Sequence, residues 1–152
     1  MSFKVLLLDS VDPVCAQVFK SRDIQADQPG KLTEKELFDR IGEYDGMVVR
    51  SATTVTPELL EKATNMKVIG RAGVGVDNID IKAATTKGVL VMNTPDGNTI
   101  STAEHTCGMI IALARNIPTA VSTVKSGGWD RKKDMGTEVH GKKLGIVGLG
   151  KS

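Results

Sequence analysis

Short apolar runs alternate with helical patterns through the first 95 residues of this 152-residue sequence. The apolar runs cover residues 5–8, 24–26, 46–51, 68–70 and 89–92. Helix starts lie between them, at Asp12-Pro13, at Thr33 with Glu36, at Thr56-Pro57 and at Ile79. The first three have the capping and proline residues that favour a helix N-terminus. Strands that alternate with helices predict an α/β fold with a parallel sheet and right-handed crossovers.

The third and fourth apolar runs each lead into an arginine. Arg50 lies at the end of one run, and Arg71 directly follows the other, ahead of Gly73 and Gly75. In an open parallel sheet, ligands bind beyond the carboxyl ends of the strands, where a guanidinium fork suits a carboxylate or a phosphate. A tight strand-to-helix turn with a solvated arginine accounts equally well for residues 68–78 taken alone.

The last third of the sequence has a different character. Ser101 and Glu104 form the pattern of a capping box, which predicts a helix rich in small and apolar residues from Ala103 to Ala114. Small side chains let another backbone approach closely, so we expect this helix to be buried against another domain or subunit. A further helix is predicted from Pro118 to Lys125, and a strand from Lys143 to Val147.

Two interpretations compete for residues 145–152. They match the phosphate-loop pattern G-x-x-x-x-G-K-[ST], but the residues before Gly145 are polar where a phosphate loop needs a buried strand. Alternatively, Leu144–Val147 is the strand, and Gly148 and Gly150 are the first two glycines of the dinucleotide fingerprint G-x-G-x-x-G. The second interpretation fits the position better, because it places the glycines at the end of a strand that follows a separate α/β unit.

Composition excludes several classes of protein. A formal charge of +2 and an aromatic content of 3% give no case for nucleic acid or an anionic membrane as a partner. The first apolar run is too short for a signal peptide or a membrane span, so a cytoplasmic location is expected. Cys15 and Cys107 have no metal-ligand spacing and are predicted to be buried thiols of a reducing compartment, without a disulfide.

Five segments together resemble the D-2-hydroxyacid dehydrogenase family: Val49–Thr53, Val68–Asn78, Val91–Pro95, Ala103–Met109 and Gly148–Gly150. The resemblance implies a flavodoxin-like substrate domain over residues 1–95 that lacks its C-terminal return segment. Residues 96–152 would then be the beginning of a Rossmann domain that binds NAD, with the active site in the cleft between the domains. The activity it implies is the oxidation of a small anionic substrate, 3-phosphoglycerate, to 3-phosphohydroxypyruvate in serine biosynthesis.

The resemblance also implies roles for individual residues. Arg50, Arg71 and Asn98 match the positions that hold the carboxylate and phosphate of the substrate. Arg131 matches a basic residue that reaches the cleft of a partner subunit in a homo-oligomer. Arg131 also belongs to a run of three basic residues, 131–133, and a run of this kind is equally well explained as an ordinary solvent-exposed surface.

For the cofactor, Val74 matches a position near the nicotinamide, where it would supply packing and backbone contacts. Gly148, Gly150, Lys151 and Ser152 match the pyrophosphate-binding turn, although a serine at position 152 departs from the family pattern.

By the same resemblance, the catalytic Arg, Glu and His, and the acidic residue that reads the ribose, come from segments beyond residue 152. Neither His105 nor His140 matches the catalytic imidazole, so we expect no catalytic activity from this chain. The choice between NAD and NADP stays open, because it depends on the acidic residue that reads the ribose. Besides the phosphate-loop nucleotide binder, one further alternative is a non-catalytic module that self-associates through the helix of residues 100–115.

Overall fold

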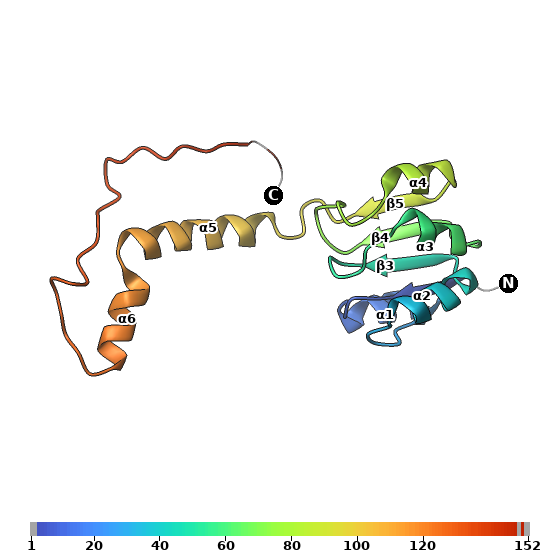
Figure 1. Cartoon of the computed structure of the whole chain (residues 1–152), viewed down its shortest axis with the longest axis horizontal. Helices are drawn as coiled ribbons and strands as arrows, with labels where there is room; N and C mark the ends of the chain where they lie inside the picture. The colour runs from blue at the N-terminus through green and yellow to red at the C-terminus, as the bar shows by residue number, and fades with distance from the viewer. Residues whose placement is uncertain (1–2, 149, 151–152) are drawn as a thin grey trace. The chain divides into compact units, whose positions relative to one another are not determined.

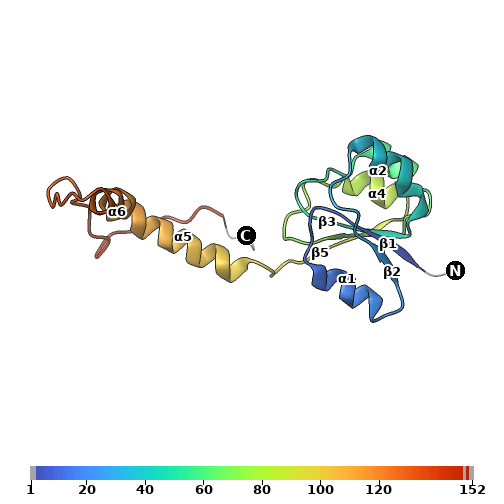
Figure 2. The same cartoon turned by 90° about the horizontal axis from the view of Figure 1, so that it is seen from below.

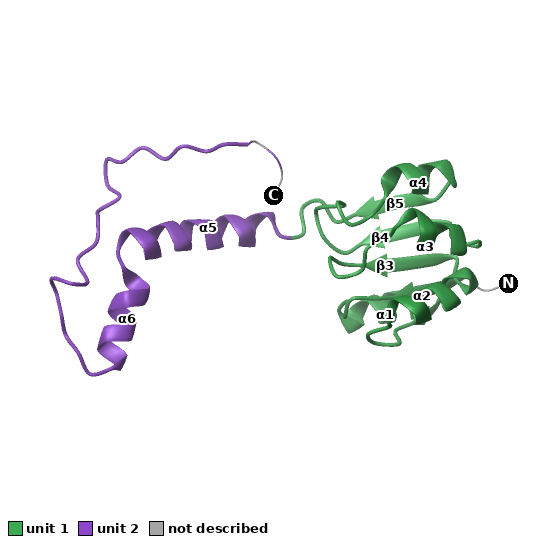
Figure 3. Cartoon of the chain, in the orientation of Figure 1, with its two compact units in different colours: residues 1–97 green, residues 98–152 purple. Residues whose placement is uncertain are grey.

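The computed structural model describes residues 3–148 and residue 150. The chain divides into two compact units, Met1–Gly97 and Asn98–Ser152, which Figure 3 colours separately. Figure 1 labels their helices and strands. Each unit is described by itself.

The first unit is built on a five-stranded sheet, and every strand pair in it is parallel. The strands are β1 (Lys4–Leu7), β2 (Gln25–Asp27), β3 (Gly46–Val49), β4 (Val68–Arg71) and β5 (Leu90–Asn93). Their order is β2-β1-β3-β4-β5, which is the flavodoxin-like order. The α/β fold with a parallel sheet that the sequence predicts is therefore confirmed.

Local capping determines where the helices of this unit begin. The helices are α1 (Pro13–Lys20), α2 (Glu34–Arg40), the 3₁₀ helix η1 (Ile41–Glu43), α3 (Pro57–Lys62) and α4 (Ile81–Thr86). Asp12 and Thr56 cap α1 and α3, and Thr33 and Glu36 form a complete capping box on α2, as predicted. Helix α4 begins two residues later than expected, because Asp80 accepts a hydrogen bond from the amide of Ala83 and so caps it.

The sheet carries helices on both faces. Figure 2 shows α1 on one side of the sheet, and α2 and α4 on the other. The larger apolar core, which includes Leu6, Tyr44, Leu60 and Ile69, packs with residues of α2, α3 and α4. A smaller core around Val5 and Leu7 packs with residues of α1. Apolar residues pack on both faces of β1 and β3, so the loops that follow these two strands start from a fixed frame.

The second unit contains two helices, α5 (Thr99–Ala114) and α6 (Ile117–Lys125). Asn116 between them has a left-handed backbone (φ 51°), and its side-chain amide donates to the carbonyl of Met135. The amide of Thr137 donates to the carbonyl of Ala114. These two bonds tie the segment after α6 back to the end of α5. No single described helix is long and apolar enough to cross a bilayer. Only α5 and α6 taken together, with a bend of 67° between them, have the length and apolar composition of a membrane-spanning segment.

Three predictions for the second unit are wrong. Residues 143–147 form no strand, because a strand needs a hydrogen-bonded neighbour and the described residues of this unit supply none. Ser101 does not begin a capping box; it lies inside α5, where its hydroxyl donates to the carbonyl of Asn98. Cys107 is exposed on α5, whereas Cys15 is half-buried; both thiols are free.

Candidate functional site

Arg50 and Arg71 lie at the same edge of the sheet, on neighbouring strands. Strands β3 and β4 are paired in parallel, with Val49 opposite Arg71, so Arg50 follows one position further along its strand. Arg50 is exposed and Arg71 is half-buried. The topology thus places two guanidinium-bearing residues side by side at the carboxyl ends of adjacent strands, where ligands of such sheets bind.

The Arg71 side chain packs over the backbone at Gly73. A β-carbon at position 73 would lie 1.7 Å from one terminal nitrogen of the guanidinium, Nη1, and 2.8 Å from Cζ. The Nε of Arg71 is buried without a hydrogen-bond partner. Within the described residues, neither guanidinium forms an ion pair with a carboxylate.

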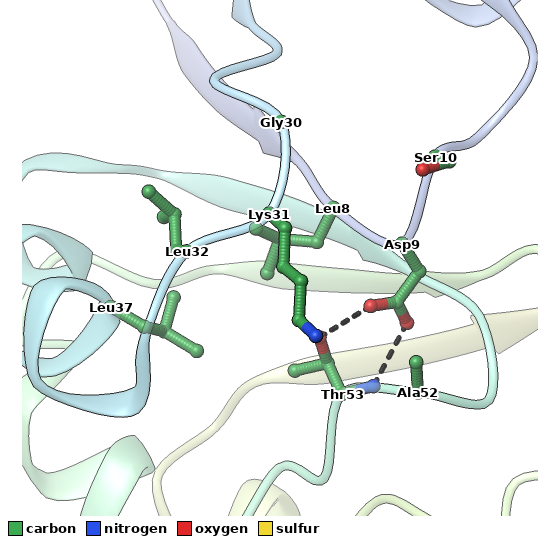
Figure 4. A pocket seen from close by; sticks show the side chains of 9 residues that line it. All are labelled: Leu8, Asp9, Ser10, Gly30, Lys31, Leu32, Leu37, Ala52 and Thr53. Atoms are coloured by element: carbon green, nitrogen blue, oxygen red, sulfur yellow. Dashed lines mark hydrogen bonds between the residues drawn. The ribbon is translucent and has the colours of Figure 1, made fainter.

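The loop after β3, residues 50–53, is held by two side chains from other loops of the first unit, Asp9 and Asn78. The carboxylate of Asp9, just beyond β1, accepts from the amides of Arg50 (2.8 Å) and Thr53 (3.0 Å) and from the hydroxyl of Thr53 (2.6 Å). The side-chain amide of Asn78 donates to the carbonyls of Arg50 (2.7 Å) and Thr53 (2.6 Å). Figure 4 shows the bonds between Asp9 and Thr53.

The pKa of Asp9 reflects these contacts. Partial burial raises the pKa of its carboxyl, but hydrogen bonds from the Thr53 hydroxyl and from the amides of Thr53, Arg50 and Ala52 lower it further than burial raises it. The net result is a pKa below the ordinary value, because each donor favours the charged form. Asp9 is therefore an anion at neutral pH, and its charge strengthens the bonds that hold the loop.

The loop after β4 is held in a similar way. The side-chain amide of Asn93, at the end of β5, donates to the carbonyl of Val74 (2.7 Å). The amide of Thr94 donates to the carbonyl of Gly73 (3.0 Å). The loop after each of these two strands thus has backbone groups that are hydrogen-bonded to residues outside that loop.

A cavity of about 350 Å³ lies beside the Asp9–Thr53 contact (Figure 4). Its polar lining includes Asp9, Ser10, Lys31 and Thr53, and its apolar lining consists of Leu8, Leu32, Leu37 and Ala52. Arg50 and Arg71 are not among its lining residues. The cavity therefore borders the loop that follows β3 without containing either guanidinium.

The other predicted site residues lie in several places. Val74 is half-buried in the loop after β4, while Asn98, at the start of α5, and Arg131 belong to the second unit and are exposed there. Gly148 has a positive φ of 101° but follows no strand, and Gly150 is exposed. Lys151 and Ser152 lie outside the described residues.

Sequence reasoning did not assign Asp9, Asn78 or Asn93 to the site. Asp9 gave a usable signal, because it closes the first apolar run at the carboxyl end of a predicted strand. The roles of Asn78 and Asn93 depend on which strands are neighbours and in which register, and a single sequence does not display either. No cluster of three metal-ligating side chains occurs among residues 3–148 and 150.

Comparisons with known proteins match almost the whole chain. Residues 5–143 match the family model described as D-isomer specific 2-hydroxyacid dehydrogenase, catalytic domain. The chain is 51% identical over 148 residues to the D-3-phosphoglycerate dehydrogenase of Rattus norvegicus, covering 97% of this chain and 28% of the rat protein. The chain thus spans little more than a quarter of this relative's length.

Two solved structures illustrate the similarity of fold. A protein from Thermus thermophilus superposes with a TM-score of 0.89 at 26% identity, covering 98% of this chain and 50% of its own. The NAD⁺-bound 3-phosphoglycerate dehydrogenase of Entamoeba histolytica superposes with a TM-score of 0.67 at 28% identity, covering 76% of this chain and 40% of its own.

Proposed function

This chain belongs to the D-isomer specific 2-hydroxyacid dehydrogenase family, and from that membership we propose that it supplies the substrate-binding part of an enzyme that oxidises 3-phosphoglycerate to 3-phosphohydroxypyruvate. The observation that carries this proposal is the pair of arginines at one edge of the sheet, without ion-pair partners among residues 3–148 and 150. Two guanidinium groups suit a small acid that carries both a carboxylate and a phosphate.

NAD is the proposed hydride acceptor of the complete enzyme. By the sequence match, Gly148 and Gly150 are the first two glycines of the fingerprint that lets a pyrophosphate approach the backbone. Val74, which belongs to the first unit, matches a position near the nicotinamide. When bound, the nicotinamide would accept a hydride from the hydroxyl-bearing carbon of the substrate.

We infer that residues 1–152 contribute binding and orientation but no general base. The oxidation of a hydroxy acid needs a group that takes the hydroxyl proton, and an imidazole with a pKa near neutrality is the usual choice. The two histidines, His105 and His140, are exposed residues of the second unit, and neither matches the family's catalytic position. We therefore expect this chain to bind the substrate without turning it over.

A titration of the isotope-labelled chain, followed by NMR, tests the proposal. We expect 3-phosphoglycerate to shift the amide signals of residues 50–53 and 71–75, and to bind roughly tenfold tighter than glycerate, because the phosphate adds a second charge-assisted contact. Replacing the exposed Arg50 by glutamine (Arg50→Gln) should weaken 3-phosphoglycerate binding by about tenfold.

Arg22→Gln is the matched control for this titration. Arg22 is equally exposed but precedes β2, so it lies at the opposite edge of the parallel sheet. Its replacement removes the same charge and should leave the affinity unchanged. Equal affinity for 3-phosphoglycerate and glycerate, or equal losses in the Arg22→Gln and Arg50→Gln proteins, would contradict the proposed site.

The apolar surface of α5 supports a second candidate function, self-association. Met109 is 57% exposed and Leu113 80%, and the two lie one turn apart on α5, so one face of this helix presents large apolar side chains to solvent. Surfaces of this kind mark protein interfaces more often than free surface. We infer that α5 pairs with α5 of a second copy, which would also make the complete enzyme a homo-oligomer.

Sedimentation equilibrium tests this pairing. The unaltered chain should sediment as a dimer, and Leu113→Lys should shift it to a monomer, because a lysine within the interface costs several kcal/mol of association energy. Val18→Lys is the control, since Val18 on α1 is 56% exposed and apolar but belongs to the first unit. A monomeric unaltered chain at micromolar concentration would contradict self-association.

A further inference from the structure

Asp9 and Asn78 bind the backbone of the same two residues. Asp9 accepts from the amides of Arg50 and Thr53, and Asn78 donates to the carbonyls of Arg50 and Thr53, all at 2.6 to 3.0 Å. The backbone amide and the backbone carbonyl of both Arg50 and Thr53 are thus hydrogen-bonded to side chains from outside the loop. The backbone that carries the Arg50 side chain is therefore fixed on both sides.

The turn after β1 has an unusual conformation at the point where it delivers Asp9. Asp9 and Ser10 both have left-handed backbones, with φ of 57° and 50°, although neither is a glycine. Such strained positions persist where the surrounding structure enforces them, and they concentrate at functional sites. Here the strained turn brings the Asp9 carboxylate within bonding distance of the loop after β3, with Leu8 still bonded to Val48.

We propose that Asp9 and Asn78 are positioning residues, which hold the Arg50–Thr53 loop in the one conformation from which Arg50 meets an anionic substrate. This inference rests on the proposed function. A flexible loop would have to be ordered when the substrate binds, and that cost would weaken binding. A loop ordered in advance leaves only the Arg50 side chain to be immobilised. Neither positioning residue needs to touch the substrate.

Arg71 does not depend on the Asp9 contacts. Its side chain packs over Gly73, and the loop after β4, which carries Asn78, is also bonded to Asn93 and Thr94. Loosening the loop after β3 should therefore affect the contribution of Arg50 to binding and spare that of Arg71. This separation makes a positioning role distinguishable from a general loss of structure.

The test compares Asp9→Ala with Asp12→Ala in the complete 152-residue chain. Asp12 also accepts a backbone amide bond, from Val14 at 2.9 Å, but it caps α1 and does not touch the loop. In Asp9→Ala, hydrogen exchange at the amides of Arg50 and Thr53 should rise by at least about tenfold. Affinity for 3-phosphoglycerate, measured by NMR titration, should fall on the order of fivefold. Asp12→Ala should change neither quantity.

A double-mutant cycle with Arg50→Gln separates positioning from a merely structural effect. In the Arg50→Gln background, Asp9→Ala should cause no further loss of affinity, because the group that it positions is already absent. Thr53→Val removes the hydroxyl that donates a hydrogen bond to Asp9, and it should lower the affinity for 3-phosphoglycerate. Thr53→Ser keeps that hydroxyl and should keep the affinity. Additive losses in the cycle would overturn the positioning role.

The two arms of the experiment fail separately. Unchanged exchange at Arg50 and Thr53 in Asp9→Ala would overturn the inference, whatever the ligand does. If exchange rises in Asp9→Ala but the affinity for 3-phosphoglycerate is unchanged, Asp9 orders the loop without positioning Arg50 for binding, and the inference is again overturned. If the unaltered chain binds no phosphorylated hydroxy acid, the proposed function fails and the inference about binding falls with it, while the exchange result still shows whether Asp9 orders the loop.

Discussion

Replacing Gly73 by alanine is expected to weaken binding of 3-phosphoglycerate as strongly as removing the Arg71 guanidinium does. A β-carbon at position 73 would overlap the Arg71 guanidinium, at 1.7 Å from Nη1. The backbone would accept the alanine, so the flexible side chain of Arg71 would move instead. Because Arg71 is half-buried, its bond to an anion is worth about 1.5 to 3 kcal/mol, and its displacement should raise the dissociation constant roughly 10- to 100-fold.

Gly70→Ala is the matched control for Gly73→Ala. A β-carbon at Gly70 meets its nearest atom, a methyl group of Val48, at 3.7 Å, which is an ordinary contact. Both changes add one methyl group to the same segment, yet only one meets the guanidinium. Arg71→Gln gives the reference loss in the same NMR titration. Gly73→Ala with unchanged affinity, or Gly70→Ala with an equal loss, would show that the Arg71 position is not set by Gly73.

The sequence predicts the elements of the first unit well, because their signals are local. Short apolar runs between helix starts identify β1, β3 and β4, and the capping box predicted from Thr33 and Glu36 forms in the structure. The strand predicted at residues 143–147 fails for a physical reason. Its residues have strand propensity, but a strand forms only when another strand takes up its backbone groups.

The site is predictable in part for the same reason. Arg50 follows a strand and Arg71 ends one, and in a parallel sheet all carboxyl ends meet at one edge, so their common edge follows from the pattern alone. Their proximity also requires that β3 lies beside β4. The clamp on the first loop is different. Asp9 reaches Arg50 only because β1 lies beside β3, and that neighbourhood is a property of the strand order, not of either segment.

The largest loss of stability is expected from Ile69→Ala. Ile69 lies fully buried in β4, in the larger core, two residues before Arg71. Removing three carbons from a buried isoleucine leaves a cavity and costs about 2 to 5 kcal/mol, against a total of about 5 to 15 kcal/mol for a domain. The urea midpoint, followed by circular dichroism, should fall accordingly, and the melting temperature by roughly 10 °C or more.

Leu90→Ala and Ile69→Val are the controls for this loss. Leu90 lies in the neighbouring strand β5, opposite Val68, but is 59% exposed, so its truncation should cost about 0.5 kcal/mol or less. Ile69→Val removes one methyl group and should cost about 0.5 to 1.5 kcal/mol while retaining the affinity for 3-phosphoglycerate. Equal losses from Ile69→Ala and Leu90→Ala would mean that the core does not lie where the sheet places it. A normal midpoint in Ile69→Val with lost affinity would instead show that β4 transmits small packing changes to Arg71.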